Sequence, residues 1–372
     1  MSREPRYLIV ANPGSLRWLA YERALLDVWG ARADITLVPW SVVIATRGNL
    51  DPLPAFDTPA IVRLESPGRD WGVAQQLLQA GDDDPKWLTL EYDKGRLVAP
   101  QTFFRGFVRV LEGLHASFAA RPHLHVTAAP RDIATMFDKR CSCRLLEGRG
   151  VPIPLTWPAP PADYDELLAQ CLPGSTYVKL NTGSSASAIA VVRSQPDWSA
   201  ISSVVPLGDG FYSSRRLVRH TGENLQRVLS FLLQEDVCVQ RGVPIAQVDG
   251  MNFDVRIVVI HGEPAFSIFR LSHQPMTNLH LGGQRGDPDR CRAIIPPRAW
   301  LDGRDAALAA AACFDSAICG VDLLFEAGSF RPHILEVNAF GDFFPNLLNA
   351  QGHGPHHVEI MQTAQRAEVR ES

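Results

Sequence analysis

Gly320–Asn346 reads GVDLLFEAGSFRPHILEVNAFGDFFPN, and most of the expected architecture follows from it. Its two apolar runs, residues 321–325 and 333–337, are short and are separated by a turn that contains glycine and serine. Apolar runs of this length around such a turn are typical of an antiparallel β-hairpin. We therefore expect two neighbouring strands in this part of the chain.

Three oxygen-bearing side chains fall on these two strands. Glu336 and Asn338 are two residues apart and share one face of a strand, while Asp322 comes from the neighbouring strand and can lie opposite them. Two carboxylates and an amide among apolar residues are costly to leave unpaired. Mg²⁺ takes oxygen ligands at about 2.1 Å and usually combines one or two carboxylates with substrate phosphates. The spacing is compatible with a divalent-cation site, but by itself it fits a solvated strand end at least as well.

The composition is that of an ordinary globular protein. The 372 residues suggest two or three domains, since domains typically have about 100–200 residues. Hydrophobic residues make up 46% of the chain and charged residues 20%, which is ample for large cores. The net charge of −4 provides no basic footprint, so nucleic acid is not an expected partner.

Targeting signals and cysteine usage agree with a cytoplasmic protein. The N-terminal residues do not show a basic start followed by a long apolar core, so no signal peptide is expected. No apolar run reaches the roughly 18–20 residues that span a membrane, so a membrane is not an expected partner. The seven cysteines are odd in number and form no CxxC pair, which favours reduced thiols over disulfides or a zinc ribbon.

The first 128 residues alternate strands and helices, which predicts a parallel α/β domain. Asn12-Pro13-Gly14-Ser15 separates the first strand from the first helix, whose N-terminus would be suited to an anion. A plain turn is the alternative, because no GxGxxG pattern is present. The expected strands are residues 7–10, 35–38 and 60–64, and the expected helices are residues 16–29, 71–80 and 102–119.

The next unit combines two lysines with a loop of small residues. Lys139 is expected inside a helix over residues 133–147, and Lys179 interrupts an apolar strand over residues 176–180. Residues 181–187, which separate this strand from the next, are mostly Ser, Ala and Gly, so their backbone N–H groups can approach phosphate oxygens. A flexible hairpin tip and two solvated lysines are the alternative. Further elements are expected as strands 188–192 and 237–240 and as helix 223–234.

A second hairpin is expected over residues 252–260 and 264–271, with charged residues on its strands. Asp254 and Arg256 point to one face of the first strand, and Arg270 interrupts the second. Such a set of charged residues typically forms an ion-pair network or binds an anion. A helix is expected over residues 304–316, and residues 353–372, despite three histidines, are expected as a tail or terminal helix and not as a metal site.

Four features in this order resemble the ATP-grasp superfamily. Within it, the chain resembles the carboxylate–amine ligases related to ribosomal-protein glutamate ligase and glutathione synthetase, roughly over residues 130–350. The features are Asp138-Lys139 leading to GVPIP, Lys179 before the small-residue loop, Gln240 before a hinge that is followed by DVR, an arginine and NLHLGG, and finally GVD with EVN.

The resemblance implies an α/β fold that is α+β in its ATP-grasp part. A Rossmann-like domain that precedes the ATP-grasp fold would occupy residues 1–128. The central, lid-forming subdomain would occupy residues 129–240, and the C-terminal subdomain with the metal site residues 241–372.

The resemblance also implies roles for individual residues. Lys139 and Lys179 would hold ATP phosphates, residues 181–187 would cover them, and the backbone of residues 240–243 would meet the adenine edge. The implied nucleotide-binding residues are Lys139, Lys179, Gly183, Ser184, Ser185, Gln240, Arg241 and Val243.

The remaining implied residues surround the transferred phosphate. Arg270, with Arg256 and Asn278 as helpers, would face the transferred phosphate and the acyl intermediate. The implied Mg²⁺ ligands, which would also accept Mn²⁺, are Asp322, Glu336 and Asn338.

These roles imply an ATP-dependent ligase that joins a carboxylate to an amine through an acyl phosphate. The substrates would be small molecules or peptides, with a carrier protein as a further candidate, and a homodimer is an open possibility. A phosphotransferase on the same fold is the first alternative, and a regulatory protein that binds a nucleotide without turnover is the second.

Two positions depart from the family's pattern. Ala339-Phe340-Gly341 and residues 342–345 follow EVN where many members have a small residue and Pro-Gly, which implies a bulkier, more aromatic acceptor pocket. Gly320 stands where some members carry an arginine, so the catalytic arginine would have to be Arg256 or Arg270.

Overall fold

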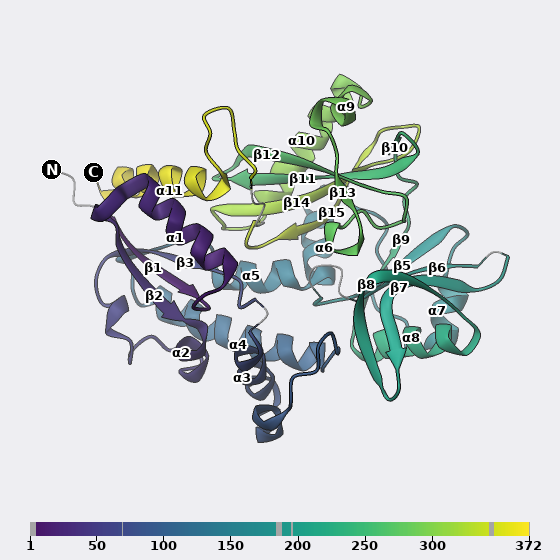
Figure 1. Ribbon diagram of the computed structural model, residues 1–372, viewed down its shortest axis with the longest axis horizontal. Coiled ribbons are helices and arrows are strands. Elements are labelled where there is room, and N and C mark those ends of the chain that lie inside the picture. Colours follow the sequence, from purple (N-terminus) through teal and green to yellow (C-terminus); the bar gives the residue numbers. More distant parts are fainter. Residues whose placement is uncertain (1–4, 69, 184–187, 195, 342–345, 372) are drawn as a thin grey trace.

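The computed structural model describes residues 5–371 except 69, 184–187, 195 and 342–345. It contains three β-sheets, which Figure 1 shows in three lobes around a common centre. Their strands lie within residues 6–126, 175–241 and 247–338. The last strand of the second sheet ends at Arg241, one residue past the predicted boundary at 240, and the division into three segments stays a prediction.

The first sheet is parallel, as the alternating pattern predicts, and has the strand order β2-β1-β3-β4. Its strands are β1 (Arg6–Ala11), β2 (Asp34–Pro39), β3 (Ala60–Leu64) and β4 (Leu124–Val126). The chain goes from β1 to β2 on one side and then returns to β3 on the other. The carboxyl ends of β1 and β3 are therefore a topological switch point, where open sheets of this kind bind ligands.

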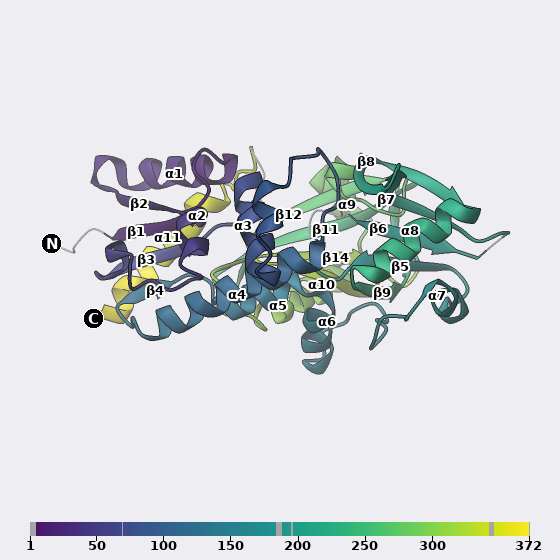
Figure 2. The same ribbon diagram turned by 90° about the horizontal axis from the view of Figure 1, so that it is seen from below.

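Helices cover both faces of the first sheet, and Figure 2 shows α1 and α4 on opposite sides of it. One face of β1 packs against α2, α3 and α4, and the other packs against α1 and α11. The bounds are α1 (Leu16–Trp29), α2 (Trp40–Ala45), α3 (Trp71–Asp82), α4 (Pro100–Ala119) and α11 (Pro355–Glu371). The last helix therefore closes on the first part of the chain.

The second sheet is antiparallel and has the strand order β8-β7-β6-β5-β9. Its strands are β5 (Ser175–Leu180), β6 (Ile189–Arg193), β7 (Ser199–Leu207), β8 (Gly210–Thr221) and β9 (Val237–Arg241). Helices α7 (Tyr164–Gln170) and α8 (Gly222–Gln234) pack on one face. On the other face, Ile189 and Val191 contact Met276 and Leu281 of the C-terminal part, which closes a pocket between the two sheets.

The third sheet is also antiparallel and has the strand order β13-β12-β11-β14-β15, with β10 paired to β11. Its strands are β10 (Gln247–Val248), β11 (Met251–Ile260), β12 (Glu263–Ser272), β13 (Gln284–Arg285), β14 (Ile318–Phe325) and β15 (Pro332–Asn338). Helix α9 (Pro288–Ala293) contacts β12, and α10 (Pro297–Ala311) contacts β14 and β15. Both predicted hairpins, β11–β12 and β14–β15, are confirmed.

Two predicted helices are wrong in their extent. The helix expected over residues 133–147 is two helices, α5 (Pro130–Phe137) and α6 (Lys139–Gly148). Asp138 leaves the helical conformation and its carboxylate accepts a hydrogen bond from Cys141 N at 2.8 Å, because aspartate competes well for the N-cap position. The helix expected over residues 304–316 is α10, which begins earlier because proline suits a first helical turn.

The structure also shows the conformation of the C-terminal segment and the state of the cysteines. Residues 355–371 form a helix, so the helical one of the two predicted alternatives is confirmed. All seven cysteines are free thiols. No helix in the described residues is both long and apolar enough to cross a bilayer.

Candidate functional site

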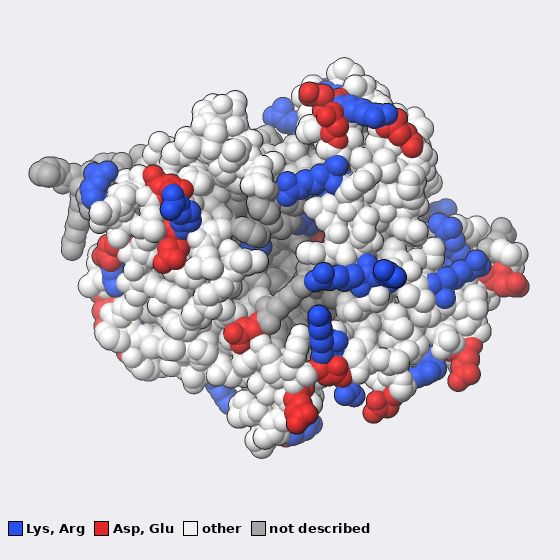
Figure 3. Space-filling model, in the orientation of Figure 1, with Lys and Arg blue, Asp and Glu red and all other residues white. Residues whose placement is uncertain are grey.

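Two connected pockets lie between the three sheets. The first lies between β5 and β9 of the second sheet and the charged face of the third sheet, and the second continues toward the first sheet. Figure 3 shows a hollow in the middle of this face of the molecule, with basic side chains on several sides. The residues that line both pockets are Lys139, Gly183, Arg270, Asn278 and Glu336.

The first pocket has apolar walls and one unpaired stretch of backbone. Tyr177 and Ile189 line it from the second sheet, and Leu324 and Leu335 from the third. The Tyr177 hydroxyl donates to Pro275 O at 2.9 Å, and burial raises the pKa of this tyrosine to about 12. Among the described residues, the N–H and C=O of Val243 have no hydrogen-bond partner. A slot of this kind fits a flat heterocycle whose polar edge meets Val243.

The predicted hinge, residues 240–243, lines this pocket throughout. The buried Gln240 accepts a hydrogen bond from Lys179 Nζ at 2.7 Å and donates one to Thr156 Oγ1 at 2.9 Å. Its side chain is therefore fixed and not free to meet a base edge. Gly242 N donates to Ser175 O at 2.6 Å, and a Cβ on Gly242 would lie 2.7 Å from the same oxygen. The hinge thus needs glycine because the neighbouring strand lies so close.

The two predicted lysines line one pocket. Lys139 Nζ donates to the backbone oxygen of Gly183, and the Lys139 N–H donates to Asn181 O at 3.0 Å. The Asn181 side chain in turn donates to Asp138 at 3.1 Å, so the base of the small-residue loop is anchored to the start of α6. Ser184 and Ser185, also predicted to bind phosphate, lie outside the described residues.

A row of charged side chains crosses one face of the third sheet. Arg256 donates to both oxygens of Asp322, at 2.5 and 2.7 Å. Arg270 donates to both oxygens of Asp254, one of them at 2.7 Å, and its Nη2 also lies 3.1 Å from Asp322. Glu336 is paired with Asp322 in the register of β14 and β15, and its carboxylate is 3.9 Å from Arg256. The ion-pair network that the pattern suggested is present. Both arginines line the second pocket, and Arg270 lines the first pocket as well.

The two aspartates of this row differ in their ionisation. Burial opposes the ionisation of Asp322, but Arg256 and Arg270 outweigh it and lower the pKa to about 2. Burial raises the pKa of Asp254 and the neighbouring charge of Asp322 adds to this rise, so that together they outweigh the stabilisation of the carboxylate by Arg270. Asp322 is thus a carboxylate that holds two guanidinium groups in place.

The proposed cation ligands are together, but they are not equivalent. A third of the Glu336 side chain is accessible, whereas Asp322 is buried. Asn338 Nδ2 donates to Gly320 O at 3.1 Å and to Glu336 at 3.3 Å. This orientation leaves the amide oxygen of Asn338 available. Both oxygens of Asp322 already bind arginines, so it has fewer lone pairs to offer. Among the described residues, no three His, Cys, Asp or Glu side chains form a metal cluster.

This donor set fits Mg²⁺ only together with a nucleotide. Glu336 at the pocket junction and the Asn338 amide in the second pocket would supply hard oxygen ligands, and phosphates and water would have to supply the rest. Asn278 lines the same junction and caps the short helix Leu279–Leu281, accepting from His280 N at 2.8 Å.

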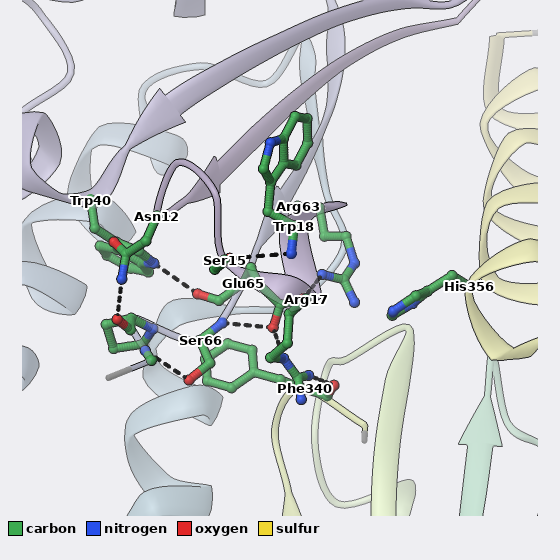
Figure 4. Close-up of polar contacts among 12 residues, drawn as sticks. Asn12, Ser15, Arg17, Trp18, Trp40, Arg63, Glu65, Ser66, Phe340 and His356 are labelled. Atoms are coloured by element: carbon green, nitrogen blue, oxygen red, sulfur yellow. Dashed lines mark hydrogen bonds and ion pairs between the residues drawn. The ribbon is translucent and has the colours of Figure 1, made fainter. Parts of the chain in front are cut away.

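The N-terminal side of the second pocket was not predicted from the sequence. Arg17, Ser66, Phe137 and Phe340 line it, and Figure 4 shows Arg17, Ser66 and Phe340 close together. The predicted aromatic character is thus represented by Phe340, whereas residues 342–345 lie outside the described residues. The sequence feature that could have identified these residues is their place directly after β1 and β3, because segments after these strands meet at the switch point of the parallel sheet.

Comparisons with known proteins agree with this architecture. No protein-family profile and no curated protein sequence matches the chain. Among solved structures, the chain is similar to the D-alanine–D-alanine ligase from Bacillus anthracis complexed with ATP, with a TM-score of 0.52, 14% identity, and coverage of 99% of this chain and all of the ligase. The chain therefore has the ATP-grasp fold.

Other solved structures are more distant. An ADP complex of N5-carboxyaminoimidazole ribonucleotide synthetase has a TM-score of 0.49 and 12% identity over 92% of this chain and 73% of its own. A RimK domain protein from Sphaerobacter thermophilus has a TM-score of 0.44 and 15% identity over 90% of this chain and 92% of its own.

Proposed function

We propose that this chain, starting from its ATP-grasp fold, is an ATP-dependent ligase that joins a carboxylate to an amine. The observation that supports this reaction is the continuity of the two pockets. A slot suited to a nucleotide opens, past two lysines and two buried arginines, into a separate pocket large enough for further substrates.

The chemistry requires that continuity. A free carboxylate does not acylate an amine, because an oxide would have to leave. In the proposed reaction a carboxylate oxygen attacks the γ-phosphorus of ATP, the bond to ADP breaks, and an acyl phosphate forms. The amine then attacks the acyl carbon, inorganic phosphate leaves with the bonding electron pair, and the amine loses a proton. Such transfers need positioning and charge stabilisation more than covalent help from the protein.

The residues at the pocket junction suit these steps. Lys139 and Lys179 would neutralise the nucleotide phosphates as point charges. Arg270, held by Asp254 and Asp322, would stabilise the charge that develops on the transferred phosphoryl and acyl oxygens, with Arg256 and Asn278 beside it. Because the arginines are already oriented by buried acids, little reorganisation would accompany the reaction.

The metal would complete the nucleotide site. Glu336 and Asn338, with Asp322 as a third candidate, would hold Mg²⁺, which when bound bridges and neutralises the phosphates of ATP. Asp322 has the additional role of orienting Arg256 and Arg270.

Trapping the activated acid tests the proposal. The protein is incubated with ATP, Mg²⁺, hydroxylamine and a broad panel of carboxylic acids, and hydroxamate, ADP and phosphate are measured. A ligase gives a hydroxamate with ADP and phosphate in equal amounts. ADP with a stable phosphorylated product and no free phosphate would instead indicate a phosphotransferase, and nucleotide binding without turnover in any combination would contradict both enzymatic functions.

A further inference from the structure

The end of the second pocket that is remote from the nucleotide belongs to the first sheet. Arg17 lines it from the first turn of α1, and residues 66–68 line it from the loop after β3. These two segments follow the carboxyl ends of β1 and β3, so the pocket ends at the switch point of the parallel sheet. The reacting phosphoryl group would lie at the opposite end, beside Arg270 and Glu336.

Arg17 is held in one orientation by the protein. Its Nε donates to Glu65 Oε1 at 2.6 Å and its Nη2 donates to Phe340 O at 2.6 Å (Figure 4). Glu65 is itself fixed, because it also accepts from Ser66 N at 2.8 Å and from Arg63. Burial opposes the ionisation of Glu65, but Arg17 and Arg63 outweigh it and lower its pKa to about 2.

This arrangement leaves part of the guanidinium available. Nη1 of Arg17 makes no hydrogen bond to the described residues, and the side chain is 24% exposed in the pocket. The Ser66 hydroxyl oxygen accepts from Gly68 N at 3.2 Å, so its own proton is free to be donated in the same region. Two donors are therefore available at this end of the second pocket, whereas Glu336, the single acid among the described residues that line it, lies at the junction with the first pocket.

The surroundings favour an anion at this point. The described charged side chains that line the second pocket are Arg17, Lys139, Arg256, Arg270, Arg285 and a single acid, Glu336. Phe137 and Phe340, with ring centroids 5.9 Å apart, form part of the wall beside Arg17. Apolar walls exclude water and lower the local dielectric constant, which strengthens the attraction between a guanidinium and an anion.

We propose that Arg17 determines substrate specificity by binding an anionic group, a carboxylate or a phosphate, at the non-reacting end of the substrate in the second pocket. This inference rests on the proposed ligase function for the other end of that substrate. Arg17 would bind and orient the substrate, and Glu65 is the residue that positions Arg17.

Paired acids test the specificity. Succinate is compared with butyrate, and glutamate with glutamine, in the hydroxylamine assay with ATP and Mg²⁺. For a pair that turns over, the dianionic acid is expected to have a kcat/KM about 10- to 100-fold higher, as hydrogen bonds to charged groups generally provide. If the wild-type protein shows this preference in none of the pairs that react, the proposal is overturned.

Variants then assign the preference to one side chain. R17Q is expected to raise KM for the dianionic acid about 10- to 100-fold while KM for ATP stays the same. R17K retains the positive charge but lacks the planar guanidinium that can donate two parallel hydrogen bonds, so its KM for the dianionic acid should lie between those of the wild type and R17Q. R23Q is the control, because Arg23 lies on the same helix, has a side chain that is 77% exposed, and among the described residues pairs with Asp27 alone, at 2.9 Å. An R17Q protein that keeps the wild-type preference contradicts the proposal.

A binding measurement separates this inference from the ligase function. With Mg²⁺ and a saturating non-hydrolysable ATP analogue, inorganic phosphate and succinate are added and Tm is recorded. Both are expected to raise Tm of the wild type and R23Q, and R17Q should lose this shift. A shift that is absent in the wild type, or equal in R17Q, overturns the anion site. An absence of hydroxamate with every acid, by contrast, counts against the ligase function.

Discussion

Asp322 and Glu336 are paired across β14 and β15, yet they differ in their surroundings. Asp322 is buried and neutralises two arginines, whereas Glu336 is partly exposed at the junction of the pockets. We expect E336Q to lower ATP turnover at least 100-fold, because in the proposed site it would remove a charged oxygen ligand of Mg²⁺, and to change stability by less than about 1 kcal/mol. ADP release and urea unfolding measure the two effects.

The matched variant D322N should behave differently. Removing one partner of a buried ion pair typically costs about 3–5 kcal/mol, because a buried charge is left uncompensated. D322N is therefore expected to lower the free energy of unfolding by roughly this amount and turnover as well. If E336Q proved as destabilising as D322N, or if it retained full turnover, the division of roles between the two acids would be wrong.

Buried titratable groups predict a loss of stability on acidification in two steps. Burial and Arg366 lower the pKa of His261 to about 4, so the unfolded chain binds more protons than the folded one between about pH 6.5 and 4, and stability falls there as pH falls. Glu65 and Asp322, each with a pKa of about 2 in the folded protein, add a second loss below about pH 4.5.

Urea unfolding at pH 7, 5 and 3.5 measures both steps. H261N should weaken the first step and leave the second, since asparagine tolerates the positive φ of 48° at this turn but does not titrate. An unchanged dependence between pH 7 and 5 in this variant would assign the first step to other groups.

At the residue scale, the sequence predicted which side chains gather but not how they pair. Alternation within each hairpin correctly placed Asp322 and Glu336 on neighbouring strands of one hairpin, and Asp254 and Arg256 on one strand of the other with Arg270 on its second strand. Whether an aspartate meets a metal or an arginine depends on which strands are neighbours in the sheet. Because β14 lies beside β11, Asp322 faces Arg256, and no local pattern encodes that order.

In the proposed function, nucleotide binding would depend on the hinge between β9 and β10. A Cβ on Gly242 would lie 2.7 Å from Ser175 O and 3.1 Å from the Tyr177 ring, so G242A must shift the hinge or β5. We expect G242A to raise KM for ATP about tenfold or more and to cost about 1–3 kcal/mol of stability. Nucleotide titration and urea unfolding check both values.

Gly148 provides the control for this prediction. It ends α6, and a Cβ there would meet nothing within 4 Å. G148A is expected to leave KM for ATP unchanged and to be neutral or slightly stabilising, because alanine favours helix over glycine. Equal effects of the two substitutions would show that the close approach at Gly242 is unimportant.

Helices and strands with a clear periodicity of apolar residues were predictable from the sequence, but breaks within such elements were not. The α1 helix has its predicted bounds, because Ser15 and Gly30 mark its ends. The break at Asp138 was missed, because the apolar spacing continues across it while a single side-chain hydrogen bond to Cys141 N decides the conformation. That break places Lys139 at the beginning of α6, from where it reaches Gly183.

At the scale of the whole molecule, contacts between distant segments complete the site. Ile189 and Val191 of the second sheet contact Met276 and Leu281, and α11 returns from the C-terminal part to pack on α1. The sequence order alone does not specify such contacts, since they depend on how three separately formed sheets meet. Arg17 and Phe340, more than 300 residues apart, are one result.

The buried pair Arg63–Glu359 joins the first sheet to the last helix. Glu359 is fully buried and accepts from Arg63 Nε at 2.7 Å and Nη2 at 3.2 Å, while Arg63 also contacts Glu65 and stacks 4.2 Å from the Tyr21 ring. We expect E359Q to cost about 3–5 kcal/mol, because Arg63 would keep only one of its two buried acids. Urea unfolding of the full chain measures this loss.

A double-mutant cycle separates the pair from its surroundings. R63M combined with E359L removes both charges, so it should cost less than the sum of the single variants, with a coupling of about 1–3 kcal/mol. The exposed pair Arg23–Asp27 is the control, where R23Q should change stability by less than about 1 kcal/mol.

Because Glu65 holds both Arg63 and Arg17, loss of the buried pair should also raise KM for a dianionic substrate. An E359Q protein with normal stability and normal KM would mean that α11 is held by apolar packing alone, through residues such as Ile360.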